Sequence, residues 1–99
     1  MSQFLKYSDG KPKYSLIPPK PIEGLARVLT YGAQKYKPNN WKKCKDTSVY
    51  VDALMRHLEA HRSGILFDGE SGLPHLHHAL CNLVFLCELE VEGKLQIKE

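Results

Sequence analysis

Residues 73–92 restrict the fold most, because this helical segment is apolar around nearly its whole circumference except for one polar strip. At about 100° per residue, His75, His78 and Asn82 fall within a sector of roughly 60°. The opposite sector is apolar and contains Leu76, Ala79, Leu80, Leu83 and Cys87. A helix that is apolar nearly all round is usually buried, and buried polar groups need partners. We therefore expect the strip to face polar groups, a metal ion, a ligand or enclosed water, with His77 at a surface or an interface.

Two more segments have helical signals. Residues 22–36 carry apolar side chains at helical spacing, namely Ile22, Leu25, Ala26, Leu29 and Ala33. The other helix is expected to begin near Asp46 or Thr47, both good N-cap types, and to end at Ser63 before Gly64. The third helix is predicted to begin near Leu73, to have Pro74 in its first turn, and to end near Glu92. The expected fold is mostly α, a small bundle of about three helices.

The ends of the chain are predicted to be irregular. Residues 1–21 contain Asp9-Gly10, Lys11-Pro12 and the run 18–21, which favour turns and extended backbone. We predict one domain over 1–99, with a Pro-rich arm at 1–21, a helical core at 22–92 and a tail at 93–99. A chain of 99 residues buries a modest core, so a homo-oligomer is expected.

Composition indicates the cellular compartment and the class of ligand. The three cysteines form no C-x-x-C pair, which is typical of a reducing, cytoplasmic environment, and no apolar run is long enough to span a membrane. The net charge of +3 favours anionic ligands without demanding nucleic acid, so no specific nucleic-acid partner is expected.

A second polar strip lies on the helix predicted at 46–63. His57 and His61 are one turn apart, and Arg56 is adjacent to His57. Antiparallel packing of this helix on the next one, through a short loop, would bring the two strips together. The loop adds Asp68 and Glu70. The N-terminus of the helix that follows would favour an anion.

Three explanations fit these residues. Imidazoles with one or two carboxylates can bind a divalent ion that organises phosphates and activates water. Without a metal, histidines can perform general acid–base work near neutral pH. The structural alternative is a set of core histidines that are hydrogen-bonded to one another and to carboxylates.

An aromatic and basic cluster lies in the first half of the chain. Tyr31 and Lys35 are four residues apart on the first predicted helix, and Asn40-Trp41 follows in the loop. Aromatic rings can stack on a base and lysine can hold a phosphate. The alternative is that Tyr31 and Trp41 are amphipathic residues at the edge of the core.

Several stretches together resemble a known family. The sequences KPKYSLIPP, YGAQKY followed by NNW, ALMRHLEAH, and FDGESGLPHLHHALCNLVFL are similar to the N-terminal domain of phage dATP/dGTP diphosphohydrolases of the MazZ type. The resemblance covers roughly residues 11–90. It implies hydrolysis of a purine deoxynucleoside triphosphate to a monophosphate and pyrophosphate by metal-assisted attack of water, and a distant relation to all-α MazG-type pyrophosphohydrolases.

The resemblance also implies roles for individual residues. The predicted catalytic groups are His57, Glu70, His75 and His78. The predicted nucleotide-binding residues are Lys13, Tyr31, Lys35, Asn40, Trp41, Arg56 and Asn82. The predicted metal ligands are Asp68, Glu70, His75 and His78, for Mg²⁺, Mn²⁺ or a softer ion. His61 lies outside the shared motif.

One departure keeps a second function open. MazG-type enzymes hold Mg²⁺ with an E-x-x-E and a later E-x-x-D on facing helices, and this chain has neither motif. Histidine and asparagine occupy its helix strips instead, which favours a softer metal or none. The alternative function is therefore a protein that binds and sequesters a nucleotide or a nucleotide-derived signal, for example against host defence. A third hypothesis is that the protein is a small interaction module whose histidines are structural.

Overall fold

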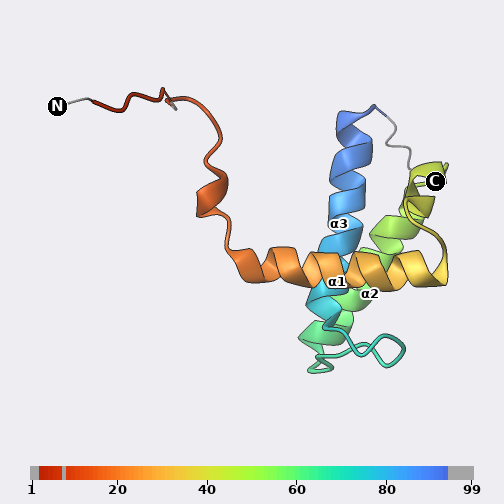
Figure 1. Cartoon of the computed structure of the whole chain (residues 1–99). Helices are drawn as coiled ribbons and strands as arrows, with labels where there is room; N and C mark the ends of the chain where they lie inside the picture. Colours follow the sequence, from red (N-terminus) through yellow and green to blue (C-terminus); the bar gives the residue numbers. More distant parts are fainter. Residues whose placement is uncertain (1–2, 8, 94–99) are drawn as a thin grey trace.

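The computed structural model describes residues 3–7 and 9–93. Its elements are η1 (Tyr14–Leu16), α1 (Pro19–Lys35), η2 (Asn40–Lys43), α2 (Ser48–Arg62) and α3 (His75–Val91). The described residues contain no strand longer than an isolated bridge between Phe67 and Pro74. The prediction of a mostly α fold with three main helices is confirmed (Figure 1).

Helix α1 begins earlier than Ile22, the predicted first residue. Pro18 is its N-cap in extended backbone, and Pro19 and Pro21 lie in the first turn. Turns and extended backbone were predicted for this run, and the prediction is wrong for residues 19–21, which are helical. Proline is tolerated in a first turn, because the N–H that it lacks has no intrahelical partner there and its φ already suits a helix.

Helix α2 begins and ends as its caps predict. Thr47 is the N-cap and is fully buried. Asp46 precedes it and accepts hydrogen bonds from the backbone N–H and the hydroxyl of Ser48 at 3.1 and 2.7 Å. At the other end, Gly64 adopts φ +92°, and the N–H of Ile65 reaches the carbonyl of Ala60 at 3.0 Å. This is the left-handed glycine stop that the sequence indicates.

Helix α3 begins two residues later than predicted. Pro74 is its N-cap rather than a residue of the first turn. The segment before it pairs with the loop: the N–H of Asp68 donates to the carbonyl of Leu73, and the N–H of His75 donates to that of Leu66, both at 2.8 Å. This pairing holds Pro74 at φ −58° and ψ 137°, outside the helical range, so the helix begins after it.

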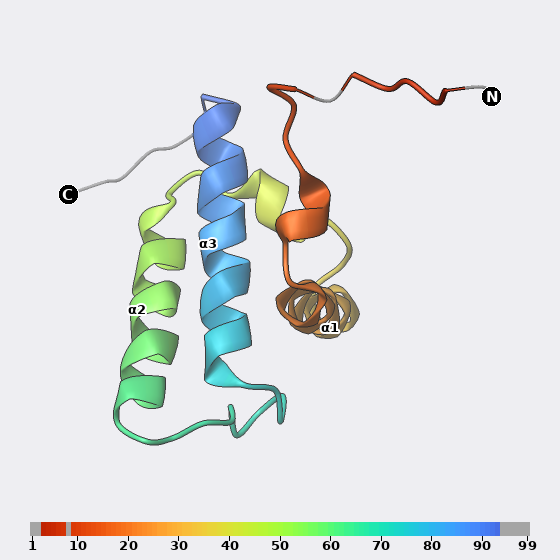
Figure 2. The ribbon, with the colours of Figure 1, turned by 90° about the vertical axis from the view of Figure 1, so that its left-hand side faces the viewer.

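Helix α3 packs against both other helices. It runs antiparallel to α2, as expected for a short connection, and α1 crosses it steeply on another side (Figures 1 and 2). Gly24 permits that crossing, because a Cβ at this position would collide with the imidazole of His77. His77 therefore lies at a helix interface, one of the two positions that the helical geometry predicts for it.

The buried apolar core of the described residues is small: Val28, Ala79, Cys81 and Leu89. On α1, the buried positions are Gly24 and Val28, whereas Ile22 and Leu29 of the predicted apolar stripe are 51 and 37% exposed. On α3, Leu76 and Leu83 are 43 and 46% exposed. Two neighbours cannot enclose a helix that is apolar on most of its surface.

The chain before α1 leaves the helical core in both views (Figures 1 and 2). Phe4, Tyr7 and Tyr14 are each at least 79% exposed. Apart from Gly93, the predicted tail at 93–99 lies outside the described residues. None of the described helices has the length and apolar character needed to cross a membrane.

Candidate functional site

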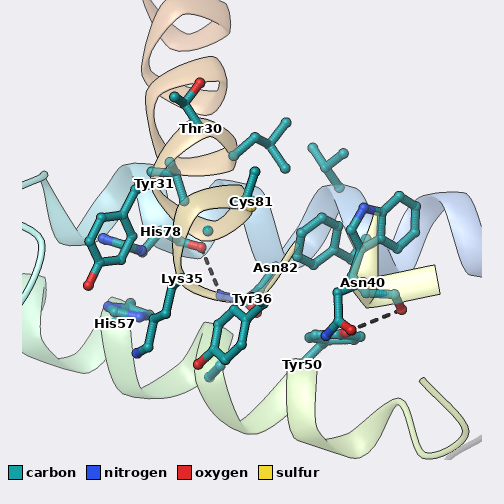
Figure 3. A pocket seen from close by; sticks show the side chains of 18 of the residues that line it. Thr30, Tyr31, Lys35, Tyr36, Asn40, Tyr50, His57, His78, Cys81 and Asn82 are labelled. Atoms are coloured by element: carbon teal, nitrogen blue, oxygen red, sulfur yellow. Dashed lines mark hydrogen bonds between the residues drawn. The ribbon is translucent and has the colours of Figure 1, made fainter. Parts of the chain in front are cut away.

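A cavity of about 920 Å³ opens where the C-terminal half of α1 faces α2 and α3. Its walls come from α1, the loop through η2, α2, the loop at 68–70 and α3 (Figure 3). Ligand sites for small molecules commonly have volumes of about 300–1,000 Å³. The cavity is therefore large enough for a nucleotide-sized ligand.

One end of the cavity, the aromatic end, consists of Trp41, Tyr50 and Phe85. The rings of Trp41 and Phe85 stack with centroids 4.6 Å apart and planes 15° apart. The Tyr50 ring packs at a tilt on that of Phe85, with centroids 5.2 Å apart. The Tyr50 hydroxyl donates to the carbonyl of Trp41 at 3.3 Å, which ties α2 to η2. Burial raises the pKa of Tyr50 to about 12, so its hydroxyl is uncharged near neutral pH. The ammonium of Lys42 lies over the Trp41 ring, 5.7 Å from its centroid.

The other end, the histidine end, contains His57 and His78 with Tyr31 and Lys35 across from them (Figure 3). The rings of His57 and His78 stack with centroids 4.6 Å apart and planes 12° apart. His57 Nδ1 lies 2.8 Å from His75 Nδ1, so one of these two nitrogens donates and the other accepts. The antiparallel packing of α2 on α3 thus brings the two predicted strips together.

Burial lowers the pKa of both His57 and His78. The neighbouring imidazoles add to the lowering at His57, whereas Asp68 opposes it at both residues. His78 Nε2 also lies 2.6 Å from the hydroxyl of Ser71. Neutral imidazoles held by hydrogen bonds can accept a proton near pH 7.

A carboxylate from the loop reaches the same end. Glu70 accepts hydrogen bonds from Lys35 Nζ at 2.6 Å and from the Tyr31 hydroxyl at 2.9 Å. These bonds lower the pKa of Glu70 and raise the pKa values of Tyr31 and Lys35. The Tyr31 ring meets that of His78 edge-on at 6.4 Å. Tyr31 therefore connects the carboxylate to the histidines.

Most of the predicted site residues lie together. Those that line the cavity are Tyr31, Lys35, Asn40, Trp41, Arg56, His57, Asp68, Glu70, His78 and Asn82. His75 lies behind His57 rather than on the wall, and Asn82 Nδ2 donates to the carbonyl of His78 at 2.9 Å. Lys13 is the exposed N-cap of η1, outside the wall of the cavity.

Ser71, Tyr50 and Phe85 make contacts at the site but were absent from the sequence prediction. Phe85 is three residues beyond Asn82, so the helical spacing of the polar strip pointed to this position. Ser71 is in the stretch DGES that carries the resemblance. No local signal marks Tyr50, because its contacts with Trp41 and Phe85 come from other elements.

The predicted metal ligands already have partners within the protein. Glu70 accepts from Tyr31 and Lys35, His75 pairs with His57, and His78 pairs with Ser71. Within residues 3–7 and 9–93, no three side chains of His, Cys, Asp or Glu are placed to share one metal ion. The residues therefore do not form a metal cage on their own in this arrangement, and the predicted metal remains a prediction.

Comparison with known proteins identifies the family. Residues 1–99 match the family described as dATP/dGTP diphosphohydrolase, N-terminal. A protein of Salmonella phage PMBT28, described as a dATP/dGTP diphosphohydrolase, is 42% identical over 83 residues, which make up 83% of this chain and 28% of the relative. The chain thus spans less than a third of that relative's length. No solved structure gives a significant match. The chain belongs to the family of dATP/dGTP diphosphohydrolase N-terminal domains.

Proposed function

We propose that the cavity binds a purine deoxynucleoside triphosphate and that the protein hydrolyses it to the monophosphate and pyrophosphate. The observation that carries this proposal is that one cavity has an end lined by aromatic rings and an end with lysine, arginine and neutral histidines. A nucleotide has the matching division into a flat base and an anionic phosphate chain. The name of the phage relative supports a purine substrate.

The two ends suggest how the nucleotide lies. The base stacks at the aromatic end, where Trp41 and Phe85 offer flat faces, and Asn40 supplies an amide for its polar edge. The phosphates lie toward Lys35 and Arg56, because these cations offset their negative charge.

The neutral histidines supply a general base. A water oxygen attacks phosphorus while its proton passes to the imidazole of His57 or His78, and the bond between the α- and β-phosphates breaks. His75 acts through its hydrogen bond to His57 and so positions that ring. Asn82 fixes the backbone of α3 beside His78 rather than touching the reacting atoms.

A divalent metal ion remains part of the proposal without a step assigned to it. Mg²⁺ is usually bound by one or two carboxylates together with substrate phosphates, rather than by a complete protein cage. Asp68 and Glu70 are the cavity carboxylates that suit such an ion, and a softer ion would use His75 and His78.

Turnover tests the proposal directly. The purified chain is incubated with each of the four deoxynucleoside triphosphates, with and without Mg²⁺ or Mn²⁺, and the products are separated by ion-exchange chromatography. We expect monophosphate and pyrophosphate from dATP and dGTP. Absence of turnover across the whole panel would refute hydrolysis by this chain.

Binding without chemistry is the second candidate function. It is favoured by the engagement of the predicted metal ligands with protein partners. In that case the protein holds a nucleotide or a nucleotide-derived signal in the same cavity. Ligand recovered unchanged after denaturation of a loaded sample would support it, and recovery of a cleaved product would exclude it.

The proposal also includes an oligomeric state and a cellular location. The exposed apolar side chains on α1 and α3 support the expected homo-oligomer, because burial of such surface against a second copy would stabilise it. Sedimentation measurements would test this. A cytoplasmic location remains the expectation from the unpaired cysteines.

A further inference from the structure

The hydrogen bonds around Glu70 have a feature that the proposed reaction does not use. Tyr31 and Lys35, one helical turn apart on α1, both donate to the same carboxylate oxygen, Oε1 of Glu70. The acceptor lies 39 and 35 residues away from its donors along the chain, at the tip of the turn at 68–72. A phenol and an ammonium on neighbouring positions of a cavity wall thus hold one anionic oxygen.

This ion pair differs from the other two that involve described residues. Arg27–Glu23 and Arg62–Glu59 join residues within one turn of a single helix. Lys35–Glu70 instead joins two distant elements across the rim of the cavity, and the side chains are 40 and 62% exposed. An exposed ion pair contributes little to stability. Stability is therefore a weak reason for placing these three groups at this rim.

A phosphate oxygen suits the same donors. Lysine and tyrosine bind a carboxylate and a phosphate through the same kind of charge-assisted hydrogen bond. Both donors line the cavity beside His57 and His78, at the end to which the proposed function assigns the phosphates. A phosphate with more than one negative charge competes well against a single carboxylate for an ammonium.

We propose that the Tyr31 hydroxyl and the Lys35 ammonium form a phosphate subsite, which the Glu70 carboxylate fills as an internal anion until a polyphosphate ligand displaces it. The identity of the ligand as a nucleotide rests on the proposed function, whereas the subsite itself does not. Displacement of Glu70 leaves both donors paired and moves an exposed carboxylate into water, so no charge is left buried without a partner.

Competition by an internal anion makes a specific prediction. Removal of the charge of Glu70 strengthens the binding of an anion that uses the subsite, whereas loss of an ordinary binding residue weakens binding. Because an exposed ion pair is weak, the expected gain is about two- to fivefold in affinity. The affinity for deoxyadenosine, which has no phosphate, is expected to stay unchanged.

The test measures the binding of inorganic tripolyphosphate, dATP and deoxyadenosine by calorimetry at low salt without added metal. The variants are Glu70→Gln and Glu70→Ala, each also combined with Tyr31→Phe and with Lys35→Met. Glu59→Gln is the matched control, because it also removes a carboxylate from a surface ion pair but lies away from the cavity wall. Circular dichroism establishes that each variant is folded.

The subsite is supported if both Glu70 variants bind tripolyphosphate more tightly, Glu59→Gln does not, and Tyr31→Phe or Lys35→Met abolishes the gain. It is overturned if tripolyphosphate binds equally or less tightly to the Glu70 variants, binds more tightly to Glu59→Gln as well, or does not bind at all. If tripolyphosphate follows the expected pattern while dATP binds no better and is not hydrolysed, the subsite stands and the proposed function fails.

Discussion

The two ends of the cavity are built in different ways. At the aromatic end, Trp41 and Phe85 stack face to face, Tyr50 packs on Phe85 at a tilt, and one hydrogen bond joins Tyr50 to the backbone of Trp41. At the histidine end, His57 and His78 lie within a network of polar and titratable partners. Under the proposed function, the aromatic end recognises the flat base, and the histidine end holds the phosphates and accepts a proton.

In the proposed function, the aromatic end contributes to nucleotide binding and the histidine end to hydrolysis. Stacking on a ring is insensitive to pH and to salt, whereas the contacts of the histidine end depend on protonation and screening. Variants at the two ends are accordingly expected to change different measured quantities.

Replacing His78 by alanine is expected to lower the rate of dATP hydrolysis by about 100-fold or more, because a positioned general acid or base contributes about 10²–10⁴-fold. Binding of the nucleotide should change by only a few fold. Steady-state turnover and calorimetry measure the two effects. His61→Ala is the control, because His61 is on α2 but not on the cavity wall. Equal loss of rate in both variants would contradict a separate role for the histidine end.

Replacing Trp41 by alanine is expected to weaken dATP binding by about tenfold, since the stacking of one base contributes about 1–3 kcal/mol. Binding of inorganic tripolyphosphate should be unaffected, because it has no base. Calorimetry with the two ligands gives the comparison directly. Similar weakening for both ligands would mean that the aromatic end supports the fold rather than the base.

Lowering the pH is expected to reduce the free energy of unfolding through the groups of the histidine end. The pKa values of His57 and His78 are lowered in the folded protein, so between those values and about 6.5 the unfolded chain binds more protons. The free energy of unfolding therefore falls as pH falls through about 6.5.

Urea unfolding between pH 8 and pH 5 measures this loss. It should be smaller in His57→Gln than in the natural sequence, and unchanged in His61→Ala. A loss of the same size in all three proteins would assign it to groups outside the histidine end.

The smallest effect is expected for Lys13→Ala, which should change dATP affinity by less than about twofold, as is typical of an exposed charge without a contact. Lys13 lies before η1, outside the cavity wall. The same calorimetric assay measures it. A large loss would indicate that the arm covers the cavity, in the same molecule or in a second copy.

The sequence predicted which residues lie together better than it predicted the contacts between them. Ten of the predicted residues line one cavity because the strips on α2 and α3 follow helical periodicity, and a short loop forces antiparallel packing. The partners of those residues were less predictable. The hydrogen bonds that Glu70 accepts from Tyr31 and Lys35 are an example, because periodicity within one helix cannot indicate them.

The errors at helix ends have a similar origin. Proline signals set the start of α1 too late and the start of α3 too early. Proline in a first turn and proline before a helix look alike in sequence, because both have φ near −65°. The bridge between Phe67 and Pro74 decides the second case, and it depends on contacts across the loop.

Local physics in the sequence by itself determined the three helices, the caps at Thr47 and Gly64, and the polar strip of His75, His78 and Asn82. The tertiary structure alone decided that α1 crosses α3 at Gly24, that His57 stacks on His78, and that Glu70 occupies the donors of α1. The first group follows from interactions within a few residues along the chain. The second depends on how closely helices approach one another, which is set by packing between residues distant in the sequence.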